Sequence, residues 1–325
     1  MTQFLKEIVF PCFKLNTING GVGLPSADDG ATIPLGNKEV VVSTDSHTVT
    51  PLFFAGGDIG RLAAAGTIND IAMMGAQPLA MTCALLIEEG FPIDDLRRIL
   101  NSIATTAFEE QVAVIAGDTK VMPRNTLDKL VICTTGVGVV ERGNVVVDSG
   151  VQPGDKIIIT GPIGDHGIAI LAERDGLTFG TDLKSDVAPL WSTVKAALDV
   201  GGVHAMKDPT RGGVAAALNE LASKSGVSIW VDEEMLPIRR EVQAASQMLG
   251  IDPLQVTCEG KAIIAVEKGE AEAVQAALQK TRYGINAKIL GEAKEERQGL
   301  VLMRTKIGGT RLIQQPWAEA IPRVC

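Results

Sequence analysis

The chain ends in a cysteine, Cys325, and a thiol at this position suits covalent carrier chemistry. A residue with nothing after it lies on the most mobile part of a chain, so its thiol can enter a cleft, react there and leave again. Pro316 and Pro322 stiffen the segment before it and disfavour a terminal helix. By itself this tail fits a carrier thiol and an accidental chain end equally well, and other residues must decide between them.

Aspartates recur beside glycines and after apolar segments, which is a pattern suited to binding Mg²⁺ and phosphate. Mg²⁺ usually takes one or two carboxylates together with substrate phosphate oxygens. Glycines let backbone N–H groups approach phosphate, and a helix N-terminus adds a favourable partial charge. Singly, each aspartate also fits an ordinary turn or helix cap, but the set as a whole favours nucleotide binding. Its members are Asp28, Asp29, Asp45, Asp58, Asp70, Asp118 and Asp208.

The segment Asp208-Pro-Thr-Arg-Gly-Gly213 is less ordinary, since its composition suits an anion-binding loop. Arg211 in this loop and Lys120 in Gly117-Asp-Thr-Lys120 are able to neutralise phosphate charge. No G-x-x-x-x-G-K-[ST] motif occurs, which excludes a P-loop protein.

Two further segments allow more than one interpretation. In Cys258-Glu-Gly-Lys261, Glu259 and Lys261 bracket a glycine, which fits an acid/base pair or an exposed turn, and the spacing alone favours the turn. His166, in Gly164-Asp-His-Gly167, fits a phosphate donor at a helix start or a polar cap residue, and the cap is favoured.

The elements that must position these residues mix strands and helices without strict alternation, which favours an α+β fold over a doubly wound sheet. Apolar runs predict strands at 40–44, 112–116, 130–140, 156–160, 229–231, 262–266, 288–290 and 300–303. Helices are expected at 61–74, after Pro92, and at 166–173, 186–198, 214–224, 239–248 and 269–281. We expect an N-terminal domain at 1–148, a C-terminal α+β domain at 149–312 and a mobile tail at 313–325.

Composition narrows the class of protein. A chain of 325 residues, 46% hydrophobic and with a mean hydropathy of +0.19, has material for two sizeable cores. A net charge of −9 argues against a nucleic-acid partner, and no apolar run is long enough to span a membrane. The start has no signal-peptide form, so a cytoplasmic location is expected. Five cysteines without C-x-x-C and three unpaired histidines make a zinc site improbable.

Taken together, these segments resemble the aminoimidazole ribonucleotide synthetase-like family of ATP-dependent enzymes, and within it the HypE carbamoyl dehydratases of hydrogenase maturation. The resemblance covers nearly the whole chain, and the terminal Pro-Arg-Val-Cys325 is its most discriminating element, because the purine, thiamine and selenium branches lack it. The other segments that carry it are Ser43–Ser46, Pro51–Phe54, Gly117–Lys120, Gly164–Gly167, Pro209–Gly213 and Glu259–Lys261.

The resemblance implies the two-domain fold of that family, with a homodimer formed through the N-terminal domains and ATP with Mg²⁺ in the cleft between the domains. It implies that a carbamoyltransferase, HypF, loads the Cys325 sulfur, that ATP drives dehydration to a thiocyanate, and that an iron-carrying HypC–HypD complex receives the cyanide. Lys120 and Glu259 would assist dehydration. The residues implied for the nucleotide are Asp45, Asp70, Asp118, Lys120, Asp208, Thr210, Arg211 and Gly212, and those for the metal are Asp28, Asp45, Asp70 and Asp118.

Two other functions remain open on the sequence. A small-molecule kinase or synthetase of the same superfamily would leave Cys325 without a role. A carrier that presents a thiol-bound group without hydrolysing ATP would use it. Members of the family usually begin with a His- and Gly-rich segment that helps cover the nucleotide, whereas Met1-Thr-Gln-Phe-Leu5 starts after that point, which mildly favours the carrier.

Overall fold

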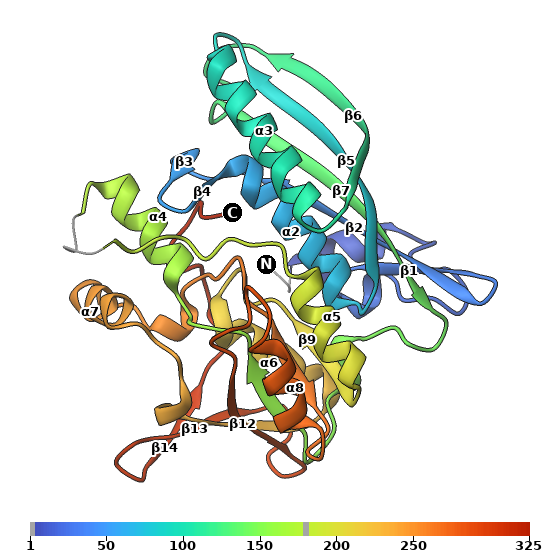
Figure 1. Ribbon diagram of the computed structural model, residues 1–325, viewed down its shortest axis with the longest axis vertical. Helices are drawn as coiled ribbons and strands as arrows, with labels where there is room; N and C mark the ends of the chain where they lie inside the picture. Colours follow the sequence, from blue (N-terminus) through green and yellow to red (C-terminus); the bar gives the residue numbers. More distant parts are fainter. Residues whose placement is uncertain (1–3, 178–181) are drawn as a thin grey trace.

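Two sheets organise the protein, and each belongs to one half of the chain (Figure 1). The computed structural model describes residues 4–177 and 182–325. The first sheet has the strand order β1-β2-β7-β5-β6, in which β5 and β6 run parallel and the other neighbours antiparallel. Its strands are β1 (Ala31–Leu35), β2 (Lys38–His47), β5 (Gln77–Glu88), β6 (Ala113–Met122) and β7 (Leu130–Glu141).

Two helices cover one face of this sheet. Helix α2 (Ile59–Met73) begins after Asp58, whose Oδ1 accepts hydrogen bonds from the backbone N–H groups of Gly60 and Arg61, so Asp58 is a helix cap, the alternative that the sequence left open. It is rich in small residues and is buried along almost its whole length, because it lies against both the first sheet and the second half of the chain. Helix α3 (Ile93–Glu109) is amphipathic and buries only one face.

The second sheet has the order β14-β13-β10-β12-β8-β11-β9 and is covered on both faces. Alternate residues of one strand enter different cores, as Ile157 and Ile159 pack on the side of α6 while Ile158 packs on the side of α5 and α8. The strands are β8 (Lys156–Ile159), β9 (Val203–Lys207), β10 (Ser228–Asp232), β11 (Ile263–Val266), β12 (Lys288–Lys294), β13 (Val301–Arg304) and β14 (Thr310–Ile313). The helices are α5 (Trp191–Val200), α6 (Gly213–Ser225) and α8 (Ala271–Leu278).

Smaller elements complete the fold. Helix α4 (Asp165–Asp175) lies against α7 (Arg240–Leu249), and a two-stranded ribbon, β3 (Phe53–Phe54) with β4 (Gly57–Asp58), packs beside α4. Short 3₁₀ or π turns occur at Leu5–Val9, Phe10–Cys12, Leu24–Ser26, Asp148–Gly150, Glu233–Met235 and Pro253–Gln255.

One helix begins later than the sequence predicts. Residues 182–190, which we call the strap, have no regular secondary structure, and α5 starts only at Trp191 instead of at 186. Pro189 explains the difference, because proline disfavours helical backbone in the residue before it. The strap contacts both halves, since the Ser185 N–H donates to the Ala55 oxygen and the Ala188 N–H donates to the Glu259 oxygen.

The α+β expectation is confirmed, since helices and strands are mixed in both halves. One placement within it is wrong: Gly117 and Asp118 do not follow a strand but lie inside β6, the outer strand of the first sheet. Within residues 4–177 and 182–325, no helix combines the length and apolar character needed to cross a bilayer.

Candidate active site

The C-terminal tail lies between the two halves, near α4 and β4 (Figure 1). Its backbone is held at successive carbonyls. The guanidinium of Arg174 donates to the Pro322 oxygen at 2.7 Å, and the backbone N–H of Thr50 donates to the Arg323 oxygen at 3.3 Å. His166 Nε2 lies 2.8 Å from the Val324 oxygen. Because residues of both halves donate hydrogen bonds to these tail carbonyls, they fix the position of the last residue between the two halves.

Two apolar side chains anchor the same tail. Ile321 and Val324 are buried in the core cluster that also holds Phe54 and Val256. A Cβ on Gly167 would lie 2.6 Å from a Val256 methyl and 3.3 Å from Ile321, so only glycine fits beneath the tail. In this docked arrangement, the segment predicted to be a mobile tail contributes side chains to a core.

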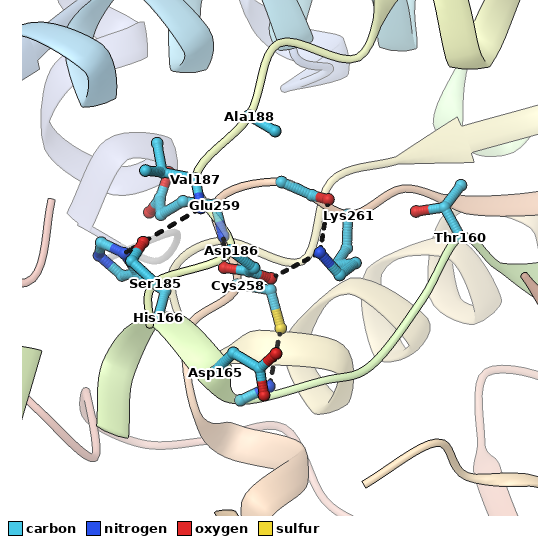
Figure 2. A network of polar contacts seen from close by, with 12 residues as sticks. Thr160, Asp165, His166, Ser185, Asp186, Val187, Ala188, Cys258, Glu259 and Lys261 are labelled. Carbon is cyan, nitrogen blue, oxygen red and sulfur yellow. Dashed lines mark hydrogen bonds and ion pairs between the residues drawn. The ribbon is translucent and has the colours of Figure 1, made fainter. Parts of the chain in front are cut away.

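His166 has a different place from either one expected for it. Its ring is fully buried and packs edge-on against Phe54, with centroids 5.6 Å apart. Ser185 Oγ accepts from the Val187 N–H and lies 2.7 Å from His166 Nδ1, so the serine hydrogen is free for Nδ1 and the ring proton belongs on Nε2 (Figure 2). Burial lowers the pKa of His166. A neutral His166 thus donates to the tail rather than to a phosphate.

The Cys325 thiol reaches the functional residues. Its Sγ lies 4.0 Å from Arg211 Nη2, and Arg211 Nε in turn pairs with Glu319 at 2.7 Å. Burial, and then the negative charge of Glu259, raise the pKa of Cys325 to about 12, while Arg211 acts in the opposite direction. The docked thiol is therefore mostly protonated at neutral pH, and the protonated form is the less nucleophilic one.

Glu259 is the second member of this group, and the favoured interpretation of its segment as an exposed turn is wrong. Cys258, Glu259, Gly260 and Lys261 are all buried. Burial, and then the charge of Asp208, raise the pKa of Glu259 well above its ordinary value. Its Oε1 has no hydrogen-bond partner among the described residues. A buried carboxyl with a free oxygen and a raised pKa is suited to exchanging a proton with a group placed beside it.

The aspartates of the two halves converge beside this group. Asp70 accepts a hydrogen bond from Ser43 Oγ at 2.6 Å, and burial, then the charge of Asp45, raise its pKa well above the ordinary value. Burial, and then the charge of Asp29, raise the pKa of Asp208 in the same way. The charge of Asp45 also acts on Glu259. One carboxylate-rich region thus joins β2 and α2 of the first half to residues of the second.

Two of the expected acidic residues lie against lysines. Lys224 pairs with Asp28 at 3.5 Å and with Asp148 at 2.7 Å. Lys207 pairs with Asp29 at 2.6 Å, and burial raises the pKa of Asp29 to about 6. Asp28 is thus already compensated by a cation. In contrast, no ion pair among the described residues involves Asp45 or Asp70, except that of Asp45 with His47 at 3.8 Å.

A hard divalent cation fits this donor set. No cluster of three or more His, Cys, Asp or Glu side chains in the described ranges is arranged to hold a metal by protein ligands alone. Mg²⁺ does not need one, because it binds through one or two carboxylates plus phosphate oxygens. Burial, and then the negative charges of Asp45 and Asp208, raise the pKa of Asp70, and a cation bound here would favour its ionised form.

The remaining predicted residues divide into two groups. Thr210 and Gly212 belong to the loop that opens α6, where the Thr210 oxygen accepts from the Gly213 N–H and Gly212, at φ +80°, faces Pro316 of the tail. Asp118 and Lys120 lie apart, exposed on β6, and no hydrogen bond or ion pair among the described residues joins them to the carboxylate region. One chain thus brings together most of the predicted site but not these two residues.

Comparisons with known proteins identify the family of the chain. The family models AIR synthase related protein, N-terminal domain and AIR synthase related protein, C-terminal domain match residues 27–140 and 152–303. Carbamoyl dehydratase HypE of Cupriavidus necator is 45% identical, with 99% of this chain and 91% of that protein covered. The chain belongs to the HypE family. A putative hydrogenase expression/formation protein of Methanocaldococcus jannaschii is 47% identical over all of this chain and 96% of its own length.

Solved HypE structures have the same fold. The crystal structure of a HypE–HypF complex matches with a TM-score of 0.88 at 40% identity, covering 97% of this chain and 98% of that one. HypE in complex with ATP matches at 0.86 and 40% identity, covering 100% and 96%. Thiamine monophosphate kinase from Aquifex aeolicus, at 18% identity and a TM-score of 0.63, shares the fold alone. The resemblance inferred from the sequence is confirmed.

Sequence reasoning missed the residues that support Glu259. Asn69 is buried in α2, donates to the oxygens of Ala188 and Glu259, and accepts from the Leu190 N–H. Asp186 accepts from the Glu259 N–H at 3.1 Å. The one available signal was Pro189, which argues for an extended segment where apolar periodicity suggested a helix.

Proposed function

We propose that this chain is an ATP-dependent dehydratase of a carbamoyl group carried on its own Cys325 sulfur. The observation that supports the proposal most directly is the docking of that thiol beside Glu259 and Arg211. A small-molecule kinase needs the same cleft for its substrate and has no use for a terminal thiol there, so that alternative is not favoured.

The chemistry balances as a dehydration. The carboxamide oxygen of the S-carbamoyl group takes the γ-phosphoryl group of ATP, which turns a poor leaving group into a good one. Breaking the C–O bond with loss of both amide protons leaves the thiocyanate, ADP, phosphate and one released proton. Glu259 accepts an amide proton at its free Oε1. Burial excludes the water that would hydrolyse the activated carboxamide.

The carboxylate region serves the nucleotide in this proposal. Asp45 and Asp70 would hold Mg²⁺, which would neutralise charge on the transferred phosphoryl group, and Asp208 with Thr210, Arg211 and Gly212 would face the phosphates. Asp28 forms an ion pair with Lys224 and is proposed to support this region rather than to bind the metal. ATP binding itself follows from the family, since a HypE relative has been crystallised with ATP.

Asp118 and Lys120 enter through a second copy of the chain. They lie on β6, whose outer edge pairs with no other described strand and whose Val114, Ile115 and Val121 are 46%, 67% and 64% exposed. An unpaired apolar strand is a ready pairing surface. We propose a homodimer through the first half, in which Asp118 binds the metal–nucleotide and Lys120 stabilises charge developing on oxygen. Light scattering should give about twice 34.2 kDa; a monomer at all micromolar concentrations would contradict the dimer.

The partners follow from the chemistry of the thiol. A carbamoyltransferase must load Cys325, and HypF is proposed for this step because a HypE relative forms a HypE–HypF complex. An iron-carrying HypC–HypD complex is proposed to receive the cyanide for NiFe hydrogenase maturation. Loading by HypF followed by Mg-ATP should remove one water from the mass of the C-terminal peptide; retention of the full carbamoyl mass would overturn the dehydratase proposal.

A further inference from the structure

The main chain of Glu259 is held at both of its polar groups by the strap and α2. The Asp186 carboxylate accepts from the Glu259 N–H at 3.1 Å. The Glu259 oxygen receives the Ala188 N–H and the Asn69 side-chain N–H, each at 3.4 Å. These supports come from residues 71 to 190 positions away along the chain, so they fix Glu259 in relation to the whole cleft.

A buried ion pair extends this support to the next peptide. Lys261 Nζ lies 3.1 Å from Asp186 Oδ2 and donates to the Gly260 oxygen at 2.8 Å (Figure 2). The side chains of Lys261 and Asp186 are only 9% and 4% exposed. A Cβ on Gly260 would lie 1.9 Å from the Asp186 oxygen, so the strap and this glycine are in direct backbone contact. The pair thus holds the Glu259–Gly260 segment at two backbone groups: Asp186 accepts from the Glu259 N–H, and Lys261 donates to the Gly260 oxygen.

Burial of this pair is poorly explained by stability alone. Removing two charges from water costs several kcal/mol per ion, and the attraction between them repays this only with good geometry, so buried ion pairs are weak stabilisers. What such a pair does provide is a fixed geometry for the groups that it bonds. Here those groups are the backbone atoms that carry the proposed base.

We infer that Asp186 is a positioning residue: together with Lys261 it clamps the Glu259–Gly260 backbone and so fixes the Glu259 carboxyl against the Cys325 thiol. The inference rests on the proposed role of Glu259 as base. Asn69 completes the clamp from the first half, and its neighbour in α2 is Asp70. The clamp therefore also fixes the position of Glu259 relative to Asp70, one of the carboxylates proposed to hold the metal.

The test uses the full chain, loaded with a carbamoyl group by HypF and then given Mg-ATP in a single turnover. The rate constant at saturating ATP and the ATP concentration for half-maximal rate are both measured from the C-terminal peptide mass. Asp186→Ala removes both clamp contacts, and Asp186→Asn keeps an acceptor for the Glu259 N–H. Asp165→Ala is the matched control, since Asp165 is likewise a buried carboxylate, 5% exposed and ion-paired with Arg239, and no hydrogen bond or ion pair among the described residues joins it to Glu259 or Gly260.

A positioning role predicts that Asp186→Ala lowers the rate constant by about 100-fold, the loss expected for a catalytic group displaced by about 1 Å. The half-maximal ATP concentration should stay within about twofold, and Asp186→Asn should fall between Asp186→Ala and the unaltered chain. Asp165→Ala should lower the thermal midpoint but keep the rate of its folded fraction. If Asp186→Ala does not fold, the near-isosteric Asp186→Asn carries the test with a loss of about tenfold.

The inference is overturned if both Asp186 variants react at the unaltered rate, or if Asp186→Ala and Asp165→Ala slow the reaction equally. It is also overturned if only the ATP requirement changes. Glu259→Gln separates this failure from failure of the proposed function. If Glu259→Gln dehydrates slowly while Asp186→Ala keeps the unaltered rate, only the positioning role of Asp186 is contradicted. If Glu259→Gln keeps the unaltered rate, the role of Glu259 as base is contradicted, and the positioning role with it.

Discussion

The two sides of the candidate site differ in how completely one chain builds them. Around Cys325, the tail carbonyls, the thiol and the Glu259 backbone all have partners within the same chain. Around the proposed nucleotide site, Asp118 and Lys120 lie exposed on an outer strand away from the other carboxylates. The thiol-processing side is thus preformed in the monomer, and the nucleotide side is complete only if a second copy supplies what β6 carries.

The largest effect is expected on the preformed side. Glu259→Gln keeps the shape of the side chain but cannot accept the amide proton, so the rate of dehydration should fall by about 10²–10⁴. Single-turnover mass analysis of the carbamoylated tail measures this rate. Glu292→Gln, which alters a carboxylate paired with Lys156 on the second sheet, is the control and should keep the full rate. Equal rates for both variants would remove Glu259 from the mechanism.

A mixing experiment tests the other side of the comparison. Lys120→Ala and Glu259→Gln chains should each be inactive alone. If Lys120 acts across a dimer, mixed dimers contain one site with both native residues. Random exchange makes about half of the dimers mixed, so about a quarter of the native activity should return. No recovery after demonstrated subunit exchange would place Lys120 and Glu259 of one chain in the same site and would contradict the cross-dimer arrangement.

The comparison also predicts a titration of the docked thiol. Its pKa of about 12 lies above that of a free cysteine, so the thiolate is the minor form at neutral pH and increases as pH rises toward 12. Arg211 opposes this shift, and Arg211→Gln should therefore raise the pKa and slow alkylation at pH 8 by several-fold. Alkylation rates from pH 7 to 11, with the exposed Cys12 as internal control, measure it. Faster alkylation of the variant would show that loss of Arg211 releases the tail.

The smallest effect concerns the anchor of the tail. Val324→Ala removes about two buried methyl equivalents, worth about 1.6 kcal/mol at most for the docked arrangement. Undocking should become more frequent, so Cys325 should react faster with a thiol reagent although the thermal midpoint hardly changes. Arg323→Ala is the control, because its side chain is 64% exposed and, within residues 4–177 and 182–325, forms an ion pair with Asp128 alone. A large fall in midpoint for Val324→Ala would mean that the tail is part of the folding core.

How much the sequence could predict also divides along this line. Local signals located α2 with its Asp58 cap, α3 with its apolar stripe and most of the acidic residues, because caps and periodicity act over a few residues. Burial of Glu259 was not predictable in this way, since it depends on Asp186 and Asn69, which approach only in the folded chain. The sequence indicated the terminal thiol but not where the tail docks. The tail is held by hydrogen bonds to its backbone carbonyls, which every sequence has.

The central claim is that Cys325 carries the group that is dehydrated, and one measurement tests it directly. The unaltered chain and a Cys325→Ala variant are each treated with HypF and its carbamoyl donor, and then with Mg-ATP. The masses of their cysteine-containing and C-terminal peptides are then measured by mass spectrometry. The account predicts a carbamoyl group on Cys325 alone, loss of one water from that peptide after ATP, and neither change in the folded variant. Modification of Cys258 or Cys12 instead, or dehydration by the Cys325→Ala chain, would contradict it.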